Sequence, residues 1–379
     1  MSNNTVVPYG SSLILDVVKG NLIICRNASV KGKGVSPKVT VFGFVKCSDG
    51  VVLQCGLLSD NFEGSGDIVI HGDLEVKNRI KMTAGHLSVI GKLRAKIIDL
   101  NGEGDLTVGG SIQVNDIRAR KIDAGGSFTA FGEVDLKKLN VRGSAKIKGG
   151  HVKEIRVGGS FDSHGSFEFD LITVEGAIKM IGKTSGGDIT VGGYCRVDGK
   201  LKFGAIHAGG GVEISGTAIG DNLTTGGILR VGSFLQLSKK LEAGGHVDIE
   251  AALTAQEVIV HGNLKAKALF ASRNVKVGGS IITVSGVVAD SLETGRRSEA
   301  KGMIRANQVI IGDEAIIEDV YAKSITMGER SYARNLYGKR INIESGAHIN
   351  GEIRYTEHLQ TERNVYLGKN PRKVSKLPE

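Results

Sequence analysis

Apolar residues recur along most of the chain in pairs that are two positions apart, and the set of pairs returns after about 17 residues. The pairs within 275–292 are Val275/Val277, Ile281/Thr283 and Val287/Ala289, and Leu292 starts the set again. Alternate residues of a β-strand point to the same face, so each pair predicts a short strand with one buried face. Three strands and a return to the start predict one three-sided turn of a β-solenoid.

The period continues far beyond this stretch. First-strand positions can be followed from Ile68 to Ile341 at steps of 16 to 19 residues. A register sustained over so many steps is typical of a repeat protein in which each turn contacts only its neighbours. The sequence therefore predicts an all-β fold, a single elongated three-sided β-helix with about 16–19 residues per coil.

Glycine accounts for 55 of the 379 residues and proline for only 4, so the glycines do not mark disorder. Many fall in pairs between the first and second strands of a turn: Gly109-Gly110, Gly125-Gly126, Gly158-Gly159, Gly192-Gly193, Gly226-Gly227, Gly244-Gly245 and Gly278-Gly279. A phosphate-binding glycine loop would occur once, between a strand and a helix. Repeated pairs instead predict tight corners, for which we expect positive φ angles.

Changes in the apolar repeat and in the glycine pattern divide the chain into parts. The predicted parts are a flexible tail at 1–12, a continuous β-helix at 13–367 and a basic tail at 368–379. Within the helix we expect irregular first coils at 13–67, a regular shaft with Gly-Gly corners at 68–300, and a distinct set of coils at 301–367 in which glycines occur singly.

Residues 300–353 read AKGMIRANQVIIGDEAIIEDVYAKSITMGERSYARNLYGKRINIESGAHINGEI. This segment resembles the bactofilins, the polymer-forming cytoskeletal β-helix proteins, whose coils follow the pattern VIIG-x-x-A-x-I-x-x-x-V-x-A. Upstream the likeness is one of periodicity. The resemblance implies a right-handed triangular β-helix that assembles end to end into nonpolar filaments without nucleotide, often at a membrane. Bactofilins usually have a shorter helix between long proline-rich tails, whereas here the shaft is longer and the tails are brief.

Self-assembly is also expected from the fold itself, because a solenoid ends in two strand edges with unpaired backbone groups. No amphipathic helix that could cap either end is evident in the sequence. The residues expected at the C-terminal polymer interface are Tyr337, Ile349, Ile353, Tyr355 and Leu359, and those at the N-terminal one are Leu13, Leu15, Leu22 and Ile24. The alternative is that the two tails fold over the ends as caps.

Enzymatic function is the least favoured interpretation. The coil lengths are not a strict multiple of six, as the hexapeptide acyltransferases require, and the nine histidines are scattered. The four cysteines, Cys25, Cys47, Cys55 and Cys195, lack the C-x-x-C spacing of a zinc site. We expect no catalytic, cofactor or metal site. Free thiols and the lack of an evident signal peptide favour the cytoplasm.

The net charge of +9 is spread along the chain. Repetition could align basic residues into a stripe that binds anionic lipid or nucleic acid, although an ordinary solvated face is favoured. Arg372, Lys373 and Lys376 are better candidates for docking an acidic protein partner. The sequence thus predicts a cytoskeletal scaffold whose main partner is itself, with a membrane surface as a further partner and nucleic acid as a less favoured one. The alternative is a non-polymeric solenoid that serves as a binding platform.

Overall fold

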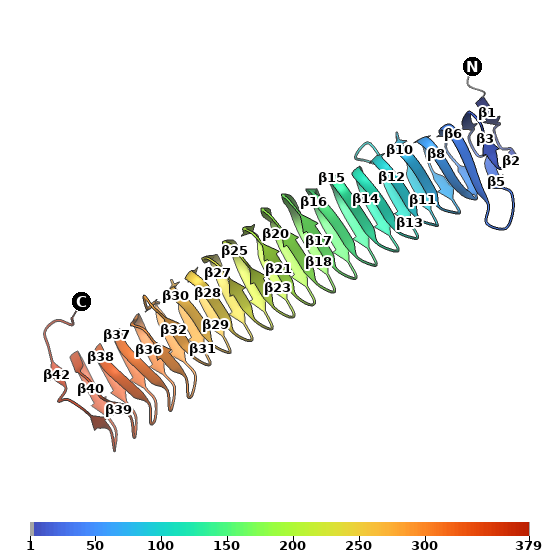
Figure 1. Cartoon of the computed structure of the whole chain (residues 1–379). Helices are drawn as coiled ribbons and strands as arrows, with labels where there is room; N and C mark the ends of the chain where they lie inside the picture. The colour runs from blue at the N-terminus through green and yellow to red at the C-terminus, as the bar shows by residue number, and fades with distance from the viewer. Residues whose placement is uncertain (1–3, 379) are drawn as a thin grey trace. The chain divides into compact units, whose positions relative to one another are not determined.

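The computed structural model describes residues 4–378, which contain 42 β-strands and no helix (Figure 1). The chain forms two compact units that divide between Gly192 and Gly193, called unit 1 and unit 2. All the strand pairings described within either unit are parallel, and each strand pairs with its equivalent in the next turn. The predicted all-β solenoid is therefore confirmed as the fold.

The strands of unit 1 are β1 Asn4–Val7, β2 Ser12–Leu15, β3 Val17–Val18, β4 Asn21–Ile24, β5 Ser29–Gly32, β6 Lys38–Cys47, β7 Val51–Gln54, β8 Gly56–Gly64, β9 Ile68–Ile70, β10 Leu74–Met82, β11 His86–Val89, β12 Leu93–Asp99, β13 Asp105–Val108, β14 Ile112–Ala124, β15 Phe128–Val141, β16 Ala145–Val157, β17 Phe161–His164, β18 Phe167–Val174, β19 Ile178–Ile181 and β20 Thr184–Val191.

The strands of unit 2 are β21 Cys195–Asp198, β22 Leu201–Lys202, β23 Ala205–Ala208, β24 Val212–Ile214, β25 Ala218–Thr225, β26 Leu229–Val231, β27 Leu235–Ala243, β28 Val247–Ala255, β29 Glu257–Val260, β30 Leu264–Ala271, β31 Asn274–Val277, β32 Ile281–Thr283, β33 Val287–Val288, β34 Ser291–Thr294, β35 Glu299–Lys301, β36 Ile304–Ile311, β37 Ile316–Met327, β38 Tyr332–Ile343, β39 His348–Ile349, β40 Ile353–Thr361, β41 Tyr366–Leu367 and β42 Arg372–Lys373.

Each turn has three faces, which follow from the register. Face A is the column in which Leu106 pairs with Ile122 and Ile122 with Leu139. Face B is the column of Ile112, and face C is the column of Ile117. Alternate residues on each face are buried, so equivalent apolar side chains of successive turns stack along the interior. The predicted inward pairs thus form the core.

The core contains few aromatic residues, and the largest cluster joins two faces of unit 1. Phe161 and Phe167 have ring centroids 5.7 Å apart, and Phe167 and Phe169 are stacked at 5.9 Å. All three are buried. Val, Ile, Leu and Ala fill most of the remaining interior, as a narrow three-sided core requires.

The reason predicted for the glycine pairs is wrong. None of the seven predicted pairs, which all lie within residues 4–378, contains a residue with positive φ. A Cβ atom on Gly125 would instead lie 2.2 Å from the carbonyl oxygen of Gly109 in the preceding turn. Glycine is needed here because the backbones of successive turns approach too closely for any side chain.

The predicted tails are also corrected in part. Residues 1–3 and 379 lie outside the described residues. β1 pairs with β4 in parallel register, and Val7 is fully buried, so residues 4–12 already belong to the first turn. At the other terminus β42 pairs with β40, so residues 368–378 lie against unit 2 as a partial further turn.

Candidate functional site

The first turn of unit 1 presents an open strand edge. Within residues 4–378, β1, β2 and β3 each pair on one side only, with β4, β5 and β6 respectively. The side chain of Leu13 is 37% exposed, whereas Val30, its partner in the next turn, is completely buried. Leu15 is half-buried. The edge therefore combines unpaired backbone groups with part of the apolar interior.

The same turn is apolar on its outward side as well. Val6, Ile14 and Val17 project from faces C, A and B and are exposed, with Ile14 reaching 60%. Tyr9 and Val35 in the neighbouring loops and Phe42 in β6 are exposed as well. The outward partners of Ile14 and Val17 in the next turn are Lys31 and Thr40. Exposed apolar side chains are thus concentrated at this end of unit 1, which is typical of an interaction surface.

Several predicted interface residues are buried: four point into the solenoid, and the fifth, Tyr337, points outward from face C but is covered. Leu22 and Ile24 are completely buried one turn below the N-terminal edge. At the C-terminal end of unit 2, Ile349 and Ile353 are buried, and Tyr337 is only 8% exposed. The sequence pattern identifies inward positions, but it does not show which turn is the last one that another strand covers.

The C-terminal edge is formed by the residues beyond these. Tyr355 and Leu359 of β40 are half-buried. Arg372 and Lys373 form β42, which pairs with the first part of β40. Lys376 follows on the same segment and, like both of them, is exposed. The predicted docking residues are therefore on the surface, but two of them are also part of the sheet.

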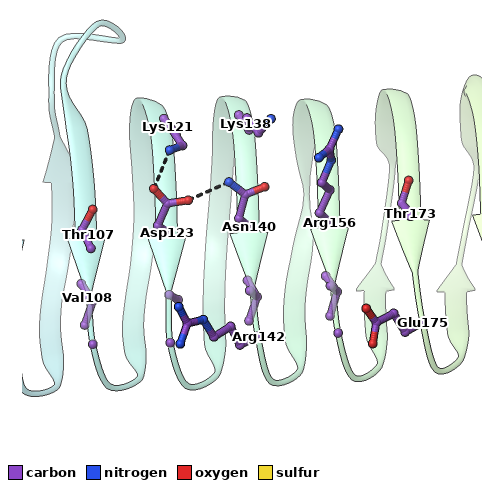
Figure 2. A pocket seen from close by; sticks show the side chains of 16 residues that line it. Thr107, Val108, Lys121, Asp123, Lys138, Asn140, Arg142, Arg156, Thr173 and Glu175 are labelled. Carbon is purple, nitrogen blue, oxygen red and sulfur yellow. Dashed lines mark hydrogen bonds and ion pairs between the residues drawn. The ribbon is translucent and has the colours of Figure 1, made fainter.

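A shallow groove of about 950 Å³ follows face A of unit 1 beside the glycine corners (Figure 2). Its polar and charged lining residues are Thr107, Lys121, Asp123, Lys138, Asn140, Arg142, Arg156, Thr173 and Glu175. The groove exists because glycines such as Gly109, Gly125 and Gly158 leave the corner without side chains.

Most of the groove's charges neutralise one another. Lys121 lies 2.7 Å from Asp123, and Asn140 donates a hydrogen bond of 2.6 Å to the same carboxylate (Figure 2). Burial acts to raise the pKa of Asp123, but these two contacts outweigh it and lower the pKa. Lys138 and Arg156 both pair with Glu154. The groove therefore does not present a continuous basic stripe.

The buried thiols are chemically inert. Burial raises the pKa of Cys195 to about 12 and that of Cys55 to about 11, and it also raises the pKa of Cys47. Thiolates are the reactive form, so these side chains are poor nucleophiles and poor metal ligands. No group of three or more His, Cys, Asp or Glu side chains within residues 4–378 is arranged to hold a metal ion.

No family model, curated protein or solved structure gives a significant match to the chain. The part of the chain that the structure describes also has no helix long and apolar enough to cross a membrane. The open strand edges and the exposed surfaces described above are therefore the features that bear on function.

Proposed function

We propose that the chain is a cytoplasmic structural scaffold that self-assembles through its open strand edges, in the manner of the bactofilins. The observation that carries this proposal is the first turn of unit 1, where three strands have one unpaired side and Leu13 is uncovered. A strand from a second copy would satisfy the free backbone groups and bury the apolar edge at the same time.

The resemblance to bactofilins supports the way in which each solenoid turn is built, but it does not identify the polymer interface. In the motif of residues 309–322, Val309, Ala315, Ile317, Val320 and Ala322 are all buried. The motif thus encodes inward positions and the corner between them. Assembly is supported separately by the edges.

The edge can be tested with a charge placed on it. Leu13→Arg should abolish sedimentable polymers while leaving the protein folded, because an arginine cannot be buried there without a partner. The matched control is Val284→Arg, since Val284 is 83% exposed and belongs to unit 2 rather than to the first turn of unit 1. Sedimentation and negative-stain microscopy give the readout. Equal polymerisation of the two variants would reject the edge as the interface.

A second candidate function, docking on an anionic membrane surface, is favoured by the charge around the same turn. Residues 1–47 contain six basic residues and one acidic residue, a net charge of +5. Among residues 4–47, the exposed lysines that pair with no carboxylate of the described residues are Lys19, Lys31, Lys33 and Lys46, whereas Lys38 pairs with Glu75. The exposed apolar residues of the first turn could insert between lipid headgroups, and each nearby lysine would add about 1 kcal/mol to the binding free energy at an anionic surface.

Vesicle sedimentation tests this alternative. Binding to vesicles that contain the anionic lipid phosphatidylserine should be lost with purely zwitterionic vesicles and after Ile14→Asp. Competition by DNA would indicate that charge alone drives the binding. Retention of binding after Ile14→Asp would argue against insertion of the tip.

A further inference from the structure

A ladder of basic and aromatic side chains runs along the outward side of face C near the C-terminus. It consists of Arg305, Tyr321, Tyr337 and Arg354, which occupy equivalent positions in four successive turns. The rings of Tyr321 and Tyr337 are stacked with centroids 4.5 Å apart, and the Arg305 guanidinium lies 5.4 Å from the Tyr321 centroid. Stacking and cation–π attraction hold these side chains in place, so the ladder is a preformed surface.

The end of the chain lies on this ladder. Leu377 and Pro378 line a pocket of about 270 Å³ together with Tyr321 and Tyr337. Both C-terminal residues are half-buried, while Ser375 and Lys376 before them are exposed. Figure 1 shows the chain leaving β42 and continuing to the C-terminus beside unit 2. An apolar Leu-Pro pair against tyrosine rings is the type of contact by which aromatic surfaces hold extended proline-containing segments.

The same segment covers part of the C-terminal edge. Arg372 and Lys373 pair with Arg354 and Tyr355, and the Val374 N–H donates a 2.9 Å hydrogen bond to the Tyr355 carbonyl oxygen. β42 therefore occupies the position that the next strand of a stacked second copy would take. The remainder of β40, from Glu357 to Thr361, has no strand on that side within residues 4–378.

This attachment is weak. β42 has only two residues, and Arg372 lies directly beside Arg354 in the register, so two like charges are adjacent. Arg354 is itself paired with Glu352 at 2.8 Å. The Lys369 amine lies 3.7 Å from the Glu352 carboxylate, which is a long and therefore weak ion pair. Short edge segments of this kind open at low free energy, so the Leu377–Pro378 contact is the main anchor.

We propose that residues 372–378 form a detachable cap, anchored on the tyrosine ladder, which blocks addition of a second copy at β40. Release of Leu377 and Pro378 frees β42, and the full edge of β40 becomes available to a strand of another chain. This inference rests on the proposed self-assembly and specifies how it is regulated.

The test uses two variants of the full chain. Leu377→Asp places a charge against the tyrosine rings and should release the cap. Ser375→Asp adds the same charge at an exposed neighbouring position and serves as the control. Hydrogen exchange of the Val374 N–H, which donates to the Tyr355 carbonyl oxygen, should become about tenfold faster in Leu377→Asp and stay unchanged in Ser375→Asp. Light scattering should show faster polymer growth for Leu377→Asp alone.

The outcomes separate the inference from the function on which it rests. Unchanged exchange in Leu377→Asp would overturn the docking of the cap. Faster exchange without faster growth, in a protein whose polymers are still lost in Leu13→Arg, would overturn the blocking role and leave self-assembly intact. If neither the unmodified chain nor Leu377→Asp polymerises, self-assembly fails and the blocking role fails with it, while the exchange result still decides whether the cap docks.

Discussion

Unit 2 builds the corner between faces A and B in two ways. In the coils before residue 281 the corner is short and contains glycine pairs such as Gly226-Gly227, where a Cβ on Gly226 would lie 2.4 Å from the Gly209 carbonyl oxygen. In the coils after residue 294 the corner is longer and contains one left-handed residue per turn. These residues are Arg297, Glu314, Arg330, Gly346 and Asn364, with φ between 53° and 69°.

The difference shows that a corner can either exclude side chains or use them. The short corner stacks backbone directly on backbone and has no room for a Cβ. The longer corner turns through a left-handed residue, so its side chains point outward and stack on each other. Glu314 lies 2.6 Å from Arg296, 2.7 Å from Arg297 and 3.6 Å from Arg330. The corners around Glu314 are therefore charged corners, in contrast to the glycine corners.

The largest effect expected from this comparison comes from placing the same residue in both corners. Gly226→Asn should reduce the free energy of unfolding by about 2–3 kcal/mol, because its Cβ overlaps backbone that cannot move away. Gly346→Asn should cost less than about 1 kcal/mol, because asparagine tolerates a left-handed conformation. Thermal melts and peptide-level hydrogen exchange around each site would measure the difference. Equal costs at the two sites would refute the distinction between the corners.

The same corners show how much of the fold can be predicted from the sequence. The period fixes the inward positions, because an apolar pair such as Val275/Val277 has only one way to reach the interior. The cause of the glycine pairs was missed, because close approach between turns depends on the spacing of stacked backbones and not on local turn geometry. The sequence did contain a signal, because the corners after residue 294 have no glycine pairs. The structure shows that these corners turn through residues such as Arg297 and Glu314 with positive φ, so positive φ does not account for the glycine pairs.

The edges were harder to predict for a related reason. Ile349 and Ile353 have the same pattern as any other inward pair, and the sequence does not indicate that β42 follows beyond the predicted end of the β-helix at residue 367. Two-residue strands are too short to leave a periodic pattern. The outward apolar residues of the first turn, Val6, Ile14 and Val17, could have been recognised, because they break the alternation of apolar and polar positions.

A smaller effect is expected from the charged corner on changing pH. Hydrogen bonds from Arg297 and Arg296 lower the pKa of Glu314 from its ordinary value of 4.5 to about 2. A carboxylate whose pKa is depressed by folding stabilises the folded state above its ordinary pKa, and this contribution is lost as the pH falls from 4.5 to 2.

Glu314→Gln should therefore melt at a lower temperature than the unmodified chain at pH 7, and the difference in melting temperature should close progressively below pH 4.5. The effect should be small, because the cluster is solvent-exposed and screened. Because the Gly226-Gly227 corner contains no titrating group, the loss caused by Gly226→Asn should persist at pH 3. If the gap for Glu314→Gln also persisted at pH 2, the arginine cluster would not be what supports the charged corner.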